Sequence, residues 1–109
     1  MENKIRVLVK EPKGELKEKV IKDDFKDFMG LVDGYIEPVY VEEIYKDRGI
    51  TIYVNDSGRL NGLPFNINVP TYGGLLGTIV FSKVNGMGDG ITLSDEDIEF
   101  IKSLDWVKS

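Results

Sequence analysis

The chain contains neither histidine nor cysteine, so two common ways of holding a small fold together are missing. Disulfide bonds and most structural zinc sites need those side chains. The fold must rest on a buried apolar core, and 109 residues with 41% hydrophobic content can build one. The same absence removes every thiol nucleophile and most general bases that work near neutral pH, which argues against catalysis.

The first third of the chain predicts a hairpin followed by a helix. Ile5–Lys10 is a compact β-branched strand, Pro12–Gly14 supplies a turn, and Glu15–Ile21 alternates weakly and returns as a second strand. Asp23 is expected to cap a helix over residues 24–32, which ends just before a glycine. The apolar face of this helix is expected to consist of Phe25, Phe28, Met29 and Val32.

The remainder predicts three more strands, a long loop and a terminal helix. Strands are expected at Tyr35–Val41, Ile50–Val54 and Thr78–Ser82. A loop rich in glycine, asparagine and proline is expected over residues 61–77. Ser94, followed by three acidic residues, begins the terminal helix, whose apolar positions recur at helical period. These positions are Ile98, Phe100, Ile101, Leu104 and Val107.

The order of these elements is β-β-α-β-β-loop-β-α, within a single domain over residues 1–109. This order predicts an α+β fold in which a sheet packs against a short helix and a C-terminal helix. The first five elements also suit a β-grasp-like sheet that wraps one helix. Neither a signal peptide nor an apolar stretch of membrane-spanning length is visible, so we expect a soluble protein in the cytoplasm.

The charge distribution argues against nucleic-acid binding. The net charge is −5, and the three arginines, Arg6, Arg48 and Arg59, lie far apart in the sequence. Binding to a phosphate backbone needs clustered lysine and arginine side chains. We therefore expect no nucleic-acid partner, and the excess acidic residues are expected to form a solvated face.

Residues 60–67 are the segment that core formation explains least, because two asparagines, a glycine and a proline stand among apolar residues. This composition favours a rigid recognition loop, although the same segment could also cover one end of the core. Arg59 and Tyr72 are expected to contact an anionic or planar ligand. Trp106 falls outside the apolar stripe of its helix and is expected to anchor a partner. The candidate binding residues are Arg59, Asn61, Gly62, Pro64, Asn66, Tyr72 and Trp106.

No pattern in the chain indicates catalytic or metal-binding chemistry. The acidic groups near residues 23–27 stand beside lysines, which suits solvated charges better than a carboxylate pair in an apolar pocket. The glycine-rich segment 85–90 lacks the lysine and hydroxyl of a phosphate-binding loop and matches a calcium loop only in part. We expect no catalytic residue, no metal and no cofactor.

Five short segments are distributed over nearly the whole length of the chain: Ile5–Pro12, Gly34–Glu37, Asn55–Asn66, Gly77–Phe81 and Leu93–Ile98. Their order and spacing resemble those of the domain of unknown function numbered 3846, an uncharacterised family encoded by bacteria, phages and other mobile elements. One position departs from that pattern, because Ile67 stands where an arginine commonly follows the loop asparagine. The resemblance implies a small accessory protein of a phage or mobile element and implies no activity.

The leading hypothesis is a non-enzymatic binding module that works in the cytosol of a bacterial host. Its target would be a host protein, as in counter-defence, or a small nucleotide-like molecule sequestered from host signalling. A second hypothesis is a homo-oligomeric structural or regulatory protein that assembles through an edge strand or the Trp106 face. A third and less favoured hypothesis is an enzyme that uses carboxylates and a divalent metal.

Overall fold

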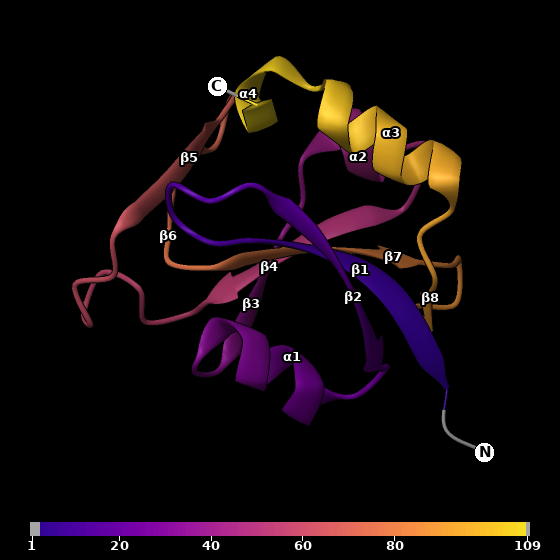
Figure 1. Ribbon diagram of the computed structural model, residues 1–109, viewed down its shortest axis with the longest axis horizontal. Helices are drawn as coiled ribbons and strands as arrows, with labels where there is room; N and C mark the ends of the chain where they lie inside the picture. Colours follow the sequence, from indigo (N-terminus) through magenta and orange to yellow (C-terminus); the bar gives the residue numbers. More distant parts are fainter. Residues whose placement is uncertain (1–2, 109) are drawn as a thin grey trace.

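A computed structural model describes residues 3–108 and shows an antiparallel sheet that lies between two helical layers (Figure 1). The strands of this sheet are β1 (Lys4–Lys10), β2 (Leu16–Lys22), β3 (Ile36–Val39), β4 (Ile50–Asn55), β7 (Ile79–Val84) and β8 (Gly90–Ile91). Their order is β2-β1-β7-β4-β3, and the short β8 pairs with β7. Every neighbouring pair runs antiparallel, so the sheet grows from hairpins and longer antiparallel returns.

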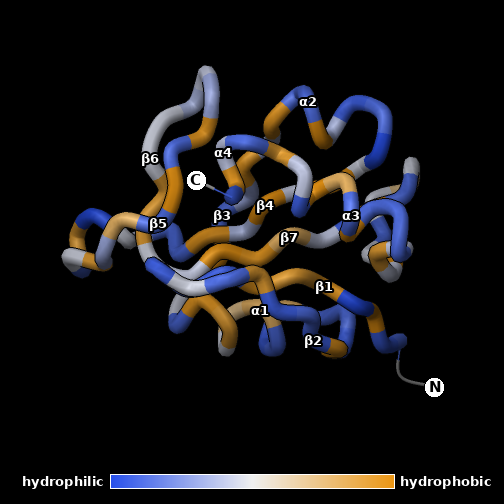
Figure 2. The backbone as a smooth tube through the Cα atoms, turned by 45° about the horizontal axis from the view of Figure 1, so that its top comes forward, coloured by the Kyte–Doolittle hydropathy of each residue, from blue (hydrophilic) through white to orange (hydrophobic). Residues whose placement is uncertain are grey.

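Within residues 3–108 the helices are α1 (Phe25–Val32), α2 (Glu42–Tyr45), α3 (Asp95–Ser103) and α4 (Asp105–Lys108). Helix α1 covers one face of the sheet, and the other three lie on the opposite face (Figure 1). Successive side chains of a strand point to opposite faces, so Val7 packs towards α1 while Leu8 enters the larger core. Figure 2 shows apolar positions running along β1, β7 and β4, between the two helical layers. The expected α+β class is confirmed.

A second, two-stranded sheet stands beside the larger core and consists of β5 (Phe65–Val69) and β6 (Gly73–Leu76). The expectation of one irregular loop over residues 61–77 was therefore wrong. Ile67, Val69 and Leu75 are buried in the larger core, and this burial stabilises the hairpin despite its glycines and prolines. The pairing shifts register between Phe65 and Ile67, as a β-bulge does.

Helix α1 begins one residue later than the sequence suggests. The side chain of Asp24, not Asp23, accepts a hydrogen bond from the backbone of Asp27 at 2.9 Å and caps the helix. Asp23 instead accepts one from the backbone of Gly90 at 3.1 Å, which fixes the start of β8. Phe25 was expected to face the core, but it is 71% exposed because the helix turns its first residue away from the sheet.

Two other segments are shorter than expected. The predicted strand Tyr35–Val41 is limited to β3, and the backbone then turns into α2, which buries Ile44. Pro38 lies on this edge strand, as expected, where a missing backbone donor costs little. The terminal helix is interrupted at Leu104, whose backbone is extended with ψ 128°, so that α4 forms a separate turn.

Asp97 ties α3 to the sheet through a buried carboxylate that is only 2% exposed. It accepts hydrogen bonds from Lys83 Nζ at 2.8 Å, from Arg48 at 3.2 Å and from the backbone of Ser94 at 3.0 Å. Ser94 in turn accepts one from the backbone of Asp97, which completes a capping box. Burial alone would raise the pKa of Asp97, but the bonds from Lys83 and Ser94 outweigh it and lower this pKa to about 2.

The lowered pKa of Asp97 predicts a loss of stability in acid. A carboxyl group whose pKa is lower in the folded state stabilises that state above its unfolded pKa, and this contribution disappears as the pH falls through the folded pKa. Between about pH 5 and about pH 2, Asp97 should therefore account for a loss of about 2 kcal/mol in the free energy of unfolding. Urea unfolding across this range measures the loss, and Asp97→Asn should remove that part of the pH dependence. An unchanged slope in the variant would contradict the assignment.

Candidate functional site

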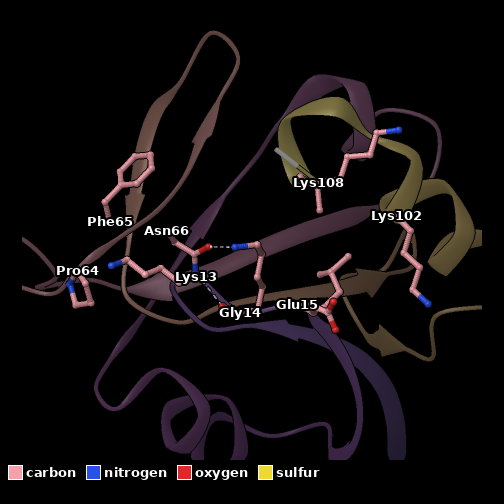
Figure 3. A pocket seen from close by; sticks show the side chains of 11 residues that line it. Lys13, Gly14, Glu15, Pro64, Phe65, Asn66, Lys102 and Lys108 are labelled. Atoms are coloured by element: carbon pink, nitrogen blue, oxygen red, sulfur yellow. Dashed lines mark hydrogen bonds between the residues drawn. The ribbon is translucent and has the colours of Figure 1, made fainter.

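A hollow of about 760 Å³ opens between the β1–β2 turn, the start of the β5–β6 hairpin and the C-terminal helices (Figure 3). This volume is in the range of small-molecule binding sites. Figure 3 shows that Lys102 and Lys108 come from the helical side, while Pro64, Phe65 and Asn66 form the opposite wall. We call this hollow the lysine groove after the side chains Lys10, Lys13, Lys102 and Lys108, which line it.

The lysine groove is locally positive in a protein whose net charge is −5. Four lysines line it, and Glu15 is the one acidic residue among its described lining residues. Lys108 also lies 3.8 Å from Asp105, but both side chains are largely exposed, and such pairs contribute little. The groove therefore carries a local excess of positive charge, whereas the protein as a whole carries a net negative charge.

Lys10 is held inside the groove wall and is only 7% exposed. Its ammonium donates a hydrogen bond to Asn66 Oδ1 at 2.8 Å, and no ion pair found among residues 3–108 includes it. Burial lowers the pKa of Lys10, because the ammonium form loses hydration. A cation in this position is stabilised by any anion that enters the groove.

Asn66 fixes the position of Lys10. Its amide nitrogen donates to the carbonyl oxygens of Lys10 and Gly77, each at 2.8 Å, which turns its carbonyl oxygen towards the Lys10 ammonium (Figure 3). The residue is buried, with 8% exposure, and its three hydrogen bonds join β5, β1 and the chain that follows β6. Asn66 therefore belongs to the rigid wall of the groove, and its part in ligand binding stays a prediction.

The β-bulge explains why two consecutive residues line the same groove. Neighbouring residues of a regular strand point to opposite faces, but a bulge changes the direction of a side chain locally. Phe65 and Asn66 stand at this bulge, and both line the groove. Phe65 rests against the backbone of Gly74, where an added Cβ would lie 3.0 Å from its ring. Phe65 as a whole is 56% exposed, so much of its side chain is available for contact.

Lys13 reaches the groove from a tight turn between β1 and β2. Gly14 donates a backbone hydrogen bond to Glu11 at 2.8 Å, and Pro12 precedes Lys13, whose φ is 63°. This geometry is that of a type II turn, in which glycine or asparagine is favoured at the position with positive φ. A lysine there is conformationally unfavourable, and its side chain is placed at the positive groove.

A comparison with protein families shows to which family the chain is related. The model of the family described as Domain of unknown function (DUF3846) matches residues 5–105. The chain belongs to this family. A search among curated proteins found no match, and a search among solved structures found none either. For this DUF3846 member the chemistry of the site must therefore be argued from its own residues.

The structure divides the predicted binding residues of this DUF3846 member among several places. Pro64 and Asn66 line the lysine groove. Arg59 and Tyr72 line a separate hollow of about 360 Å³ between the turn after β4 and the β5–β6 hairpin. That second hollow also contains carboxylates, including Asp56, which weaken its attraction for an anion. The recognition loop expected over residues 60–67 is therefore divided, because residues 60–62 form a turn whereas residues 65–67 belong to β5.

The remaining candidate residues and the two glycine-rich segments lie elsewhere in the fold. Asn61 and Gly62 lie in an exposed turn between β4 and β5, outside both hollows. Trp106 lies in α4, packs against the larger core and donates from Nε1 to Glu43 of α2 at 3.0 Å. The glycine-rich segments 71–77 and 85–90 lie at opposite ends of the sheet and do not form one site (Figure 1).

The lysines of the groove were missed because they come from distant parts of the sequence. Lys10 ends β1, Lys13 follows in a turn, and Lys102 and Lys108 stand in the last two helices. Each looks like an ordinary solvated lysine in its local context. The one local signal was the alternation of asparagine with apolar residues over residues 65–69, which indicates a strand; of its two asparagines, Asn66 lines the groove and Asn68 is exposed.

Neither a membrane-spanning helix nor a cluster of metal-binding side chains occurs among the described residues. Within residues 3–108, no helix has both the length and the apolar character needed to cross a membrane. In the same part of the chain, no group of three or more acidic side chains is placed to hold a metal ion.

Proposed function

We propose that this protein is a non-enzymatic binding module that takes up a small anionic ligand in the lysine groove. The observation that carries this proposal is the local excess of positive charge, with four lysines against one glutamate in a protein of net charge −5. We further propose that the protein serves a phage or mobile element, as the resemblance of its five segments implies. There it would act in the cytosol of the bacterial host and sequester a signal used in defence.

The lining side chains suit binding better than catalysis. Asn66 directs its three hydrogen bonds to protein atoms, so its role is to hold the wall in place. Lys13, Lys102 and Lys108 provide flexible ammonium groups that adapt to an anion without a fixed geometry. Such a set neutralises and retains a charged ligand, which is the chemistry that sequestration needs.

Binding of inorganic pyrophosphate, measured by isothermal titration calorimetry at low salt, tests this proposal. Replacing Lys102 and Lys108 together with glutamine should weaken binding about tenfold, because two attractive charges are lost. The matched control is the double variant Lys19→Gln with Lys26→Gln, which changes the net charge equally. Lys26 lies on α1, and Lys19 pairs with Val7 on the α1 face of the sheet, so this control should bind within about twofold of the wild type.

The variant Lys13→Gly separates the effect of Lys13 on stability from its effect on ligand binding. Glycine relieves the positive φ at this position, so the free energy of unfolding should stay equal or rise slightly. Pyrophosphate binding should nevertheless weaken by several fold, because one of the groove lysines is gone. Equal weakening in the α1-face control, or an absence of saturable pyrophosphate binding to the wild type, would overturn the proposed function.

A further inference from the structure

We propose that the ligand of the lysine groove is a free nucleotide, whose base stacks on Phe65 and whose phosphates contact Lys10. This inference rests on the proposed function and deepens it by naming the ligand class. Two features of the groove carry it: the exposed aromatic ring of Phe65, and the buried ammonium group of Lys10, which is hydrogen-bonded to Asn66, the residue next to Phe65.

Phe65 provides a stacking surface. Its ring is supported from behind by the backbone of Gly74 and is 56% exposed, although large apolar side chains are usually buried. An aromatic ring held in this way offers a flat face to a nucleobase, because every base has a π-face that stacks on aromatic side chains. The neighbouring Pro64 adds a second apolar surface to the same wall.

Lys10 provides the fixed positive charge for the phosphates. Its ammonium has three donors, and the hydrogen bond to Asn66 uses one of them. Lys13, Lys102 and Lys108 also line the groove, but Figure 3 shows the nitrogens of Lys102 and Lys108 directed away from Lys10, so these two lysines add long-range attraction for the phosphates. Asn66 joins the two subsites directly, since it follows Phe65 in the chain and accepts the hydrogen bond from Lys10.

The distribution of charge favours a free nucleotide over a nucleic-acid strand. A strand needs positive charge along an extended surface, whereas the rest of this protein is acidic and its net charge is −5. The groove concentrates its positive charge in one hollow of about 760 Å³, which holds a single small ligand. A short oligothymidylate should therefore bind more weakly than ADP.

Calorimetry with ADP, pyrophosphate and the oligonucleotide tests the assignment on the full chain. ADP should bind the wild type about tenfold more tightly than pyrophosphate, because the base adds a stacking contact. Phe65→Leu keeps an apolar side chain on this exposed position and should remove most of that advantage, so that ADP binding weakens several fold more than pyrophosphate binding. Lys10→Met should weaken ADP and pyrophosphate by the same factor, provided that circular dichroism shows a folded protein.

The possible outcomes separate this inference from the proposed function. If pyrophosphate binds in the groove but ADP binds no more tightly, or if Phe65→Leu weakens both ligands equally or neither, the nucleotide assignment is overturned and anion binding stands. Tighter binding of the oligonucleotide than of ADP would also overturn it, in favour of a strand end. Saturable binding of neither ADP nor pyrophosphate would overturn both proposals.

Discussion

Replacing Asp97 with alanine is expected to lower the free energy of unfolding by about 3 kcal/mol, because a buried charge pair loses its anion. Lys83 and Arg48 would remain partly buried without the carboxylate that both contact. The capping box of α3 would also lose the acceptor of the Ser94 backbone hydrogen bond. Urea unfolding near neutral pH measures the effect.

Glu96→Ala is the matched control for Asp97. Glu96 precedes Asp97 in α3 and contacts the same Arg48 at 3.4 Å, but its side chain is exposed to water. Exposed ion pairs contribute little, so this variant should lose no more than about 0.5 kcal/mol. Similar losses in the two variants would show that burial of Asp97 does not determine the strength of its contacts.

Replacing Asn66 with leucine is expected to cost about 3 kcal/mol and to loosen the β5–β6 hairpin. Leucine has a similar size but forms no hydrogen bonds, so two backbone carbonyls and the Lys10 ammonium would lose their partner. An unsatisfied buried polar group carries its full desolvation cost, and an ammonium group carries more than a neutral one. Urea unfolding again measures the loss.

Asn68→Leu provides the comparison for Asn66, since it makes the same change two residues later on β5. Asn68 is exposed, so its replacement should change the free energy of unfolding by less than about 0.5 kcal/mol. A loss below about 1 kcal/mol for Asn66→Leu would mean that water replaces its hydrogen bonds, contrary to its assigned place in the rigid wall.

Elements with a strong local pattern were predictable from the sequence. The β1–β2 hairpin follows from a β-branched run and the Pro12–Gly14 turn, and β4 follows from the run Ile50–Val54. The start of α3 follows from Ser94 and its acidic successors, which form the capping box. In these segments the local preference and the tertiary contacts agree, so sequence reasoning was sufficient.

Elements that depend on distant contacts were not predictable in the same way. The β5–β6 hairpin contains Gly73 and Gly74, and it becomes ordered because its alternate apolar residues reach the larger core. Helix α2 has four residues and no side-chain cap, so little in its sequence distinguishes it from a charged loop. For the candidate site, Asn66 and Pro64 carried a local signal, whereas the burial of Lys10 required knowledge of where the hairpin packs.

The separateness of the β5–β6 sheet has a thermodynamic consequence. Since this hairpin shares no hydrogen-bonded ladder with the six-stranded sheet, it can open as a local unit at a lower free-energy cost than global unfolding. Opening would remove one wall of the lysine groove, so a ligand that contacts both walls binds the closed state alone. Ligand binding to the groove and closure of the hairpin are then linked equilibria. A bound anion slows amide hydrogen exchange in β5 and β6 by the same factor by which it raises the ratio of closed to open hairpin.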